Sequence, residues 1–282
     1  MLALVTCAAA RHLDGDLPLL ERELPEARIV VWDDPDVDWQ VFDAVVIRST
    51  WDYHERRHEF VQWARRVESL SGLWNPLELI EWNTDKRYLL DFERDGIPIV
   101  PTEFVAVGDS VGKSIGRRID LSTDLVVKPS VGAGSNGVIR TGGDQALARA
   151  HIATLHANGN AAMLQPYLAQ VDTGGETGLV YLGGEFSHAF AKAAILAAPI
   201  VVEGGLYAEE QIERRTATPA EIAIGERVVA GLGPTAYARI DLLPTDAGPV
   251  VLEVEVTEPS LYLDLDQGAP ARAAAAFRSL AA

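Results

Sequence analysis

The sequence predicts a three-lobed protein that combines α/β and α+β architecture. Its first third alternates short β-branched runs with helical patterns, which is typical of a parallel sheet whose strands are joined by helices. In the middle third a glycine-rich turn lies between two strand-like runs, and in the last third two such runs meet at a Gly-Gly pair, a tight hairpin signal. With 282 residues, the chain is long enough for two or three small lobes.

The first lobe is expected over residues 1–97, because the break Gly96-Ile97-Pro98 ends the alternating pattern. Its strand-like runs are Leu2–Thr6, Arg28–Val31 and Ala44–Arg48. Helical patterns lie at Leu17–Leu24 and Arg56–Leu70. This order predicts a parallel α/β sheet.

Residues 98–164 are expected to form a small central α+β lobe, and residues 165–282 a C-terminal lobe of antiparallel strands. The elements predicted for the central lobe are strands at Phe104–Val107, Leu125–Lys128, Val138–Arg140 and Ala162–Gln165 and a helix near Asp144–Ala157. Those predicted for the C-terminal lobe are strands at Thr177–Leu182, Glu185–Ala191, Ala236–Leu243 and Val250–Val256 and helices near Pro219–Ala230 and Ala271–Ala281.

The charge and the apolar content of the chain exclude several kinds of partner. Lys and Arg number 24 against 41 Asp and Glu, and a net charge of −17 would repel nucleic acid and anionic membranes. The longest mostly apolar stretch, 189–202, is shorter than the roughly 20 residues that span a bilayer. Cys7 is the single cysteine, and no signal peptide is recognisable, so we expect a cytoplasmic protein. It is expected to be a monomer or a homodimer.

A glycine-rich loop follows the predicted strand that ends at Lys128. It reads Lys128-Pro-Ser-Val-Gly132-Ala-Gly134-Ser135-Asn136-Gly137, and a second strand follows it where a dinucleotide-binding fold would have a helix. Such a strand–turn–strand flap can close its backbone N–H groups, here at Gly132, Gly134 and Ser135, over phosphates. The alternative is a glycine-rich hairpin beside a solvated Lys128.

Three carboxylates mark two of the predicted strands. Glu253 and Glu255 are two residues apart, so they project from one face of a strand about 6.6 Å apart, and Asp241 lies on the strand before. Oxygen ligands without Cys or His favour Mg²⁺, which in turn indicates a phosphate substrate. The alternative is an acidic, solvated sheet face.

The order of these features resembles the ATP-grasp superfamily along nearly the whole chain. The resemblance implies a fold with ATP between the central and C-terminal lobes, and Lys86 and Lys128 as ATP contacts. It also implies an adenine-binding hinge at Gln165, Pro166, Tyr167 and Leu168, a ribose ligand in Glu176, and a phosphate ligand in Lys192. By the same resemblance Asp241, Glu253 and Glu255 would hold Mg²⁺, with Glu255 standing where many relatives have Asn.

Within the superfamily, several short sequence segments resemble the cyclo-ligase family that converts O-ureido-D-serine in D-cycloserine biosynthesis. These segments are Trp39–Tyr53, Trp74-Asn75-Pro76, Gln165-Pro166-Tyr167, Phe186–Ala189 and Glu253–Ser260. The resemblance implies an ATP- and Mg²⁺-dependent ligase of antibiotic biosynthesis that acts on a small amino-acid derivative. The segment between Lys192 and Gln211 departs from related sequences, so no substrate contact is transferred to it.

Ligases of this kind phosphorylate a carboxylate to an acyl phosphate, which a nitrogen nucleophile captures. Lys192 is expected to neutralise the transferring phosphoryl group, and Arg239 the acyl phosphate and the oxyanion that follows. For the substrate we expect Arg48, Trp51, Tyr53 and Ser260, with Arg48 emerging at the rim of the first sheet to clamp a carboxylate. The alternative is an aromatic cluster under a loop with a surface arginine.

Three functions remain open from the sequence. The first is an intramolecular cyclo-ligase, the second is a ligase of the glutathione synthetase type that joins two molecules, and the third is a nucleotide-binding protein without chemistry. The complete acidic set and the lysines Lys86, Lys128 and Lys192 argue against the third. A phosphate loop aimed at the terminal phosphoryl group predicts ADP and orthophosphate as products.

Overall fold

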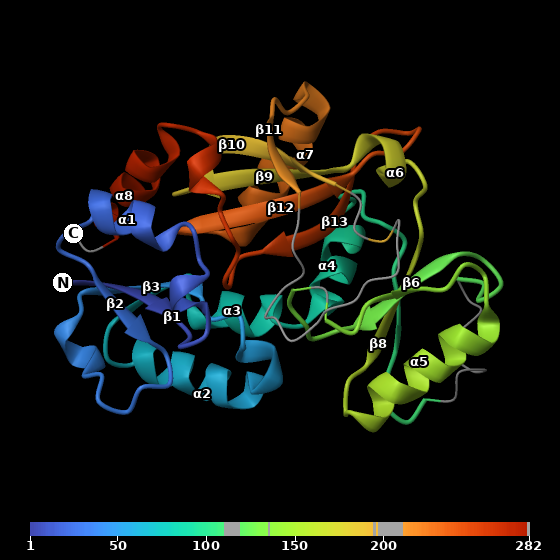
Figure 1. The fold of residues 1–282 in the computed structure, drawn as a ribbon, viewed down its shortest axis with the longest axis horizontal. Helices are drawn as coiled ribbons and strands as arrows, with labels where there is room; N and C mark the ends of the chain where they lie inside the picture. Colours follow the sequence, from blue (N-terminus) through green and yellow to red (C-terminus); the bar gives the residue numbers. More distant parts are fainter. Residues whose placement is uncertain (110–118, 135, 194–195, 197–210, 281–282) are drawn as a thin grey trace.

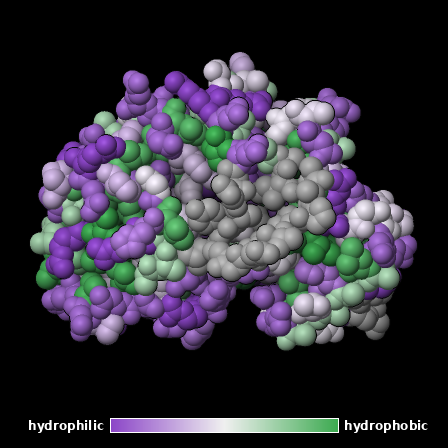
Figure 2. Space-filling view, viewed as in Figure 1, coloured by the Kyte–Doolittle hydropathy of each residue, from purple (hydrophilic) through white to green (hydrophobic). Residues whose placement is uncertain are grey.

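The computed structural model describes residues 1–109, 119–134, 136–193, 196 and 211–280. Its strands form three separate sheets. Figure 1 shows a blue N-terminal sheet and a yellow-to-orange C-terminal sheet on one side and a green central sheet on the other. Hydrophilic side chains cover much of the face drawn in Figure 2, with apolar groups between them. No helix within the described residues is long and apolar enough to cross a membrane.

The first sheet is parallel, as predicted, with the strand order β2-β1-β3-β4. Its elements are β1 (Leu2–Thr6), α1 (Leu17–Glu23), β2 (Arg28–Val31), β3 (Ala44–Ser49), α2 (Arg57–Glu68) and β4 (Gly72–Trp74). Alternate residues of β1 serve opposite faces: Leu2 and Leu4 pack with α1, whereas Ala3 and Val5 pack with α2. This double burial explains why the strand is apolar from Leu2 to Val5. The strand β4 was not predicted.

The central sheet is antiparallel, with the order β5-β8-β6-β7. Its elements are β5 (Glu103–Val105), β6 (Leu125–Pro129), β7 (Ile139–Arg140), α5 (Gln145–Ala157) and β8 (Ala162–Pro166). The helix α5 starts after Asp144, whose side chain accepts hydrogen bonds from two amides of the first turn. Its apolar side packs on β6 and β8.

The C-terminal sheet is antiparallel, with the order β11-β10-β9-β12-β13. Its elements are α6 (Val171–Gly174), β9 (Glu176–Leu182), β10 (Glu185–Lys192), β11 (Ile212–Arg215), α7 (Pro219–Leu232), β12 (Tyr237–Leu243), β13 (Val250–Glu255) and α8 (Ala269–Ser279). The predicted hairpin joins β9 to β10, where Gly183 and Gly184 have φ angles of +60° and +85°. Positive values at both positions favour glycine. The strand β11 was not predicted.

The segment between the first and central sheets packs on the C-terminal sheet. It contains α3 (Leu77–Asn83) and α4 (Leu89–Arg94), and Leu89 and Phe92 share a core with Ile240. The remaining short helical turns are Ala10–His12, Trp39–Val41, Tyr53–Glu55, Lys86–Tyr88 and Leu263–Leu265. The lobe bounds at 97 and 164 stay a prediction, and the packing of α3 and α4 favours an earlier end of the first lobe.

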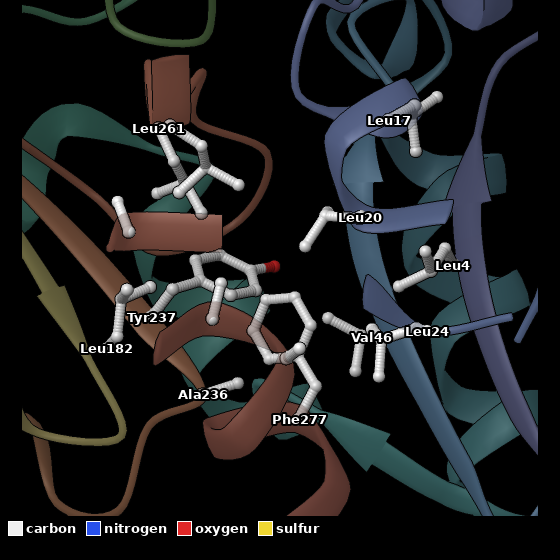
Figure 3. Packing of buried hydrophobic residues seen from close by; sticks show 14 of the residues in the cluster. Leu4, Leu17, Leu20, Leu24, Val46, Leu182, Ala236, Tyr237, Leu261 and Phe277 are labelled. Atoms are coloured by element: carbon white, nitrogen blue, oxygen red, sulfur yellow. The ribbon is translucent and has the colours of Figure 1, made fainter. Parts of the chain in front are cut away.

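A common core joins the first and C-terminal lobes. Figure 3 shows Leu4 and Leu20 of the first lobe facing Tyr237 and Phe277 of the C-terminal lobe. The helix α8 lies beside α1 as well as against β9 and β10. Because apolar burial is the main stabilising force, this core holds the two lobes in one arrangement.

Candidate active site

The outer edge of β13 is held by side chains from the segment that contains α3. The Val254 amide donates to the Tyr88 hydroxyl (2.9 Å), and its carbonyl accepts from Asn83 Nδ2 (2.7 Å). Asn83 Oδ1 also accepts from the Val256 amide (3.0 Å). These contacts satisfy backbone groups that an edge strand would leave unpaired, so β13 is fixed in place.

Four charged side chains project from one face of β12 and β13. The strand register places Asp241 opposite Glu253 and Arg239 opposite Glu255. Arg239 pairs with Asp241 (Nη2 to Oδ2, 2.9 Å) and donates a short hydrogen bond to Glu255. Its Nη1 donates to the Ser260 carbonyl (3.1 Å). The predicted common face of Glu253 and Glu255 is confirmed. It is largely removed from solvent, since Asp241 is 4% exposed and the side chains of Glu253 and Glu255 are 22% and 26% exposed.

Three lysines lie beside these carboxylates. Lys86 Nζ lies 2.9 Å from Glu253 and donates to the Gly132 carbonyl at 2.7 Å, while Lys128 Nζ lies 3.9 Å from Glu253. Lys192 Nζ lies 3.8 Å from Glu176. Lys128 is buried, so the alternative of a solvated lysine is wrong.

Burial and charge shift the titration of this cluster. Burial raises the pKa of Glu253, but Lys86 and Lys128 outweigh it and hold that pKa well below its usual range. Burial is also the largest effect on Lys128, and it lowers the pKa of that lysine although Glu253 opposes it. Burial raises the pKa of Glu255, against the opposing charge of Arg239. The site therefore concentrates opposite charges away from water.

The glycine-rich loop and the hinge form the other wall. A Cβ at Gly132 would lie 2.9 Å from Pro129 Cγ, and Gly134 has a φ of +61°, so both positions favour glycine. Ser135 lies outside the described residues. In the hinge, the Tyr167 amide donates to the Asp124 carbonyl (2.9 Å), while no described residue accepts the N–H of Leu168.

A cleft of about 590 Å³ joins these features, a volume typical of small-molecule sites. The predicted residues that line it are Trp51, Tyr53, Lys86, Lys128, Gly132, Gly134, Gln165, Pro166, Tyr167, Leu168, Glu176, Lys192, Arg239, Asp241, Glu253, Glu255 and Ser260. Their roles stay predictions. The tertiary structure nevertheless brings together side chains from the central and C-terminal sheets and from the loop after β3.

The expected position of Arg48 is wrong. Its side chain does not emerge at the rim: the residue is 1% exposed and does not line the cleft. Its Nη2 donates to the Pro259 carbonyl (2.8 Å) and lies 3.7 Å from Asp16, and its guanidinium lies 4.7 Å from the Tyr237 ring centre. A buried arginine bound in this way cannot clamp a substrate, and it is not a surface arginine either.

Sequence reasoning missed three residues of the site. Asn83 fixes β13 and lines the cleft, but a single Asn before the first lysine carries no recognisable signal. Asp16 accepts hydrogen bonds from the amides of Leu261 (2.6 Å) and Leu263 (2.8 Å), and its place in Asp14-Gly-Asp16 indicated only a loop. Glu258 lies in the segment Glu253–Ser260, which resembles the cyclo-ligase family, and it could have been noticed there as a fourth acidic residue.

The carboxylates fit a hard cation by their chemistry, although they are paired with basic groups. Among the residues that the structure describes, no group of three His, Cys, Asp or Glu side chains is arranged to hold a metal. Arg239 bridges Asp241 and Glu255, and Lys86 contacts Glu253. Binding of Mg²⁺ by all three would therefore exchange these ion pairs. An oxygen-only donor set on one strand face suits Mg²⁺.

Similar structures define the class of protein. An ATP-grasp protein with a RimK domain from Sphaerobacter thermophilus matches with a TM-score of 0.71 and 17% identity over 99% of both chains. D-alanine–D-alanine ligase from Bacillus anthracis, solved with ATP, matches with a TM-score of 0.68 and 14% identity over 99% of this chain and 96% of that chain. The fold is therefore the ATP-grasp fold, and the predicted fold class is confirmed.

Closer relatives define the family. The N-terminal domain of D-cycloserine synthetase DcsG is the family whose model matches residues 2–75. Cycloserine biosynthesis protein DcsG of Streptomyces lavendulae is 37% identical over 98% of this chain and 97% of that protein. A crystal structure of D-cycloserine synthetase DcsG matches with a TM-score of 0.87 and 35% identity over 99% of both chains. The chain belongs to the D-cycloserine synthetase family and is an ATP-dependent ligase that forms C–N bonds.

Proposed function

We propose that this protein uses ATP and Mg²⁺ to activate the carboxylate of a small amino-acid derivative, and that a nitrogen of the same molecule then closes a ring to give D-cycloserine. The observation that carries this proposal is that the hinge, three lysines and the charged face of β12 and β13 all line one cleft. The membership of the protein in the D-cycloserine synthetase family supports the same reaction.

The hinge and the lysines suit a nucleotide. The N–H of Leu168, which no described residue accepts, would donate to a purine edge, and Glu176 would accept from ribose hydroxyls. Lys86, Lys128 and Lys192 would face the phosphates, where their charge stabilises the phosphoryl group during transfer. Buried lysines act strongly here because little water screens them.

The charged face suits the acyl phosphate. When bound to Asp241, Glu253 and Glu255, Mg²⁺ would neutralise phosphate oxygens. Arg239 points its guanidinium into the same face and would then bind the oxyanion that forms when nitrogen attacks the activated carbonyl carbon. Phosphate leaves with the C–O bond electrons, and the attacking nitrogen loses its proton to water. With O-ureido-D-serine as substrate, water must also remove the carbamoyl group from that nitrogen, which releases CO₂ and ammonia and leaves D-cycloserine. Holding nitrogen and carbonyl in one molecule contributes up to about 7–11 kcal/mol through orientation.

The test is a phosphate-release assay with O-ureido-D-serine and ATP, with mass analysis of both products. We expect ADP, orthophosphate, D-cycloserine, CO₂ and ammonia. A Lys192→Met variant should still unfold in one cooperative transition but release phosphate at least about a hundredfold more slowly. AMP and pyrophosphate would contradict the phosphoryl-transfer scheme. A product that joins two substrate molecules would instead indicate a ligase acting between molecules. Cytoplasmic location, absence of nucleic-acid partners and oligomeric state stay predictions.

A further inference from the structure

Glu258 is a buried carboxylate that the reaction described above does not use. It follows β13 by three residues, is 8% exposed, and lines the cleft. No residue that the structure describes donates a hydrogen bond to its carboxylate or forms an ion pair with it. Burial raises the pKa of Glu258 well above its usual range, so its charged form is costly without a partner. A buried carboxyl group that has no partner in the native fold points to a missing ligand.

The backbone around Glu258 is held from three sides. Trp51 Nε1 donates to the Glu258 carbonyl (3.2 Å), Arg48 Nη2 to the Pro259 carbonyl (2.8 Å), and Arg239 Nη1 to the Ser260 carbonyl (3.1 Å). Three successive carbonyls are thus bound by side chains of the first and C-terminal lobes. The carboxylate is therefore presented to the cleft by a rigid segment.

Tyr53 provides a second polar group without a partner on the first-lobe side of the cleft. It is 4% exposed and lines the cleft, and no described residue hydrogen-bonds to its hydroxyl. Burial, and then the charge of Glu258, raise the pKa of the Tyr53 hydroxyl, so it stays neutral and can accept a hydrogen bond. Two oxygen groups without a described partner therefore line the same cleft from two lobes, and Glu258 has the largest charge effect on Tyr53.

The surrounding charges select the ligand group. Burial and then the charges of Glu255 and Glu253 raise the pKa of Glu258, while Lys86 and Arg239 oppose them. A second anion beside Glu258 would add to the repulsion by Glu255 and Glu253. One carboxylate and a phenol are a poor set for Mg²⁺, which prefers several hard oxygen ligands. A primary ammonium group has a positive charge and three N–H donors, which match a carboxylate and a hydroxyl.

We propose that Glu258 and Tyr53 form an amine-binding subsite that takes the ammonium group of the amino-acid substrate and of its cyclic product. The inference rests on the proposed function for the identity of that substrate. It explains how an enzyme that acts only on a carboxylate and a nitrogen nucleophile would select molecules that carry an additional amine. Glu258 and Tyr53 are binding residues, distinct from the groups assigned to phosphoryl transfer.

The experiment compares ligand pairs that differ only in the amine. Calorimetry in the presence of Mg²⁺ and ADP measures binding of D-cycloserine and isoxazolidin-3-one, and of D-serine and 3-hydroxypropionate. For the wild type we expect D-cycloserine and D-serine, which carry the amine, to bind about tenfold to a hundredfold more tightly than their partners without it. This is the typical effect of a hydrogen-bonded charge pair. Glu258→Gln should reduce that preference to about threefold or less, and Tyr53→Phe should reduce it partly.

Controls separate this inference from the proposed function. Glu185→Gln, on the exposed β9–β10 hairpin, should keep the full amine preference, and ADP affinity should be unchanged in all variants. An amine preference that survives in Glu258→Gln, or is absent from the wild type in both pairs, would overturn the subsite. A Glu258→Gln variant with normal amine binding and a slowed, pH-shifted turnover would overturn it too, in favour of a proton acceptor. Failure of the proposed function shows differently, as no orthophosphate release with O-ureido-D-serine.

Discussion

Replacement of Arg48 by Met tests whether this arginine is structural. Met keeps much of the apolar volume of the side chain but removes the guanidinium. The variant loses the charged hydrogen bond to the Pro259 carbonyl (2.8 Å) and the cation–π contact with Tyr237 (4.7 Å), and it leaves Asp16 without its cation. Breaking a buried charge pair by removing one partner typically costs about 3–5 kcal/mol in the free energy of unfolding.

The loss should depend on pH. Burial and Asp14 raise the pKa of Asp16, and Arg48 lowers it, so the variant's Asp16 has a still higher pKa in the folded state. A carboxyl whose folded pKa lies above its unfolded pKa loses stability as pH rises through that window. The destabilisation by Arg48→Met should therefore be larger near about pH 8 than near about pH 5.

Urea unfolding at both pH values, monitored by circular dichroism, measures the effect. Asp16→Asn and the double variant complete a mutant cycle, in which the double variant should lose less than the sum of the single losses. Arg94→Met is the matched control, because Arg94 pairs with Asp91 at the surface with 70% of its side chain exposed. We expect it to cost at most about 0.5 kcal/mol. If Arg48→Met costs no more than this control and raises only the KM of the amino-acid substrate, our structural assignment is refuted.

Two further variants test β13 and its charged face. Glu253→Gln should reduce phosphate release at least about a hundredfold even at high Mg²⁺. It should also lower the melting temperature, because Lys86 and Lys128 lose their counter-charge. Turnover at the wild-type rate would show that Glu253 is not a metal ligand. Asn83→Ala should lower the free energy of unfolding in urea by about 2–4 kcal/mol, because the buried Val254 carbonyl and the neighbouring amide lose their partners. An Asn83→Ala protein as stable as the wild type would show that these groups find other partners.

The local patterns of the chain determined most of its elements. Continuous, mainly apolar runs such as Leu2–Thr6 identify strands buried on both faces, and the pair Gly183-Gly184 identifies a hairpin, because both signals depend on near neighbours. The alternation at Glu253 and Glu255 placed two carboxylates on one face for the same reason. Resemblance to a family added the hinge and the lysines.

Only the tertiary structure decided which of these groups meet. Arg48 ends a strand-like run as a rim residue would, yet Pro259, Asp16 and Tyr237 enclose it, and these partners are distant along the chain. The packing of α3 and α4 on the C-terminal sheet likewise depends on long-range contacts. Glu258 could be seen in the sequence as an acidic residue, but its burial, its fixed backbone and its missing partner follow from the approach of two lobes. A sequence pattern reports local periodicity, whereas burial and charge pairing are set by residues that only the folded chain brings together.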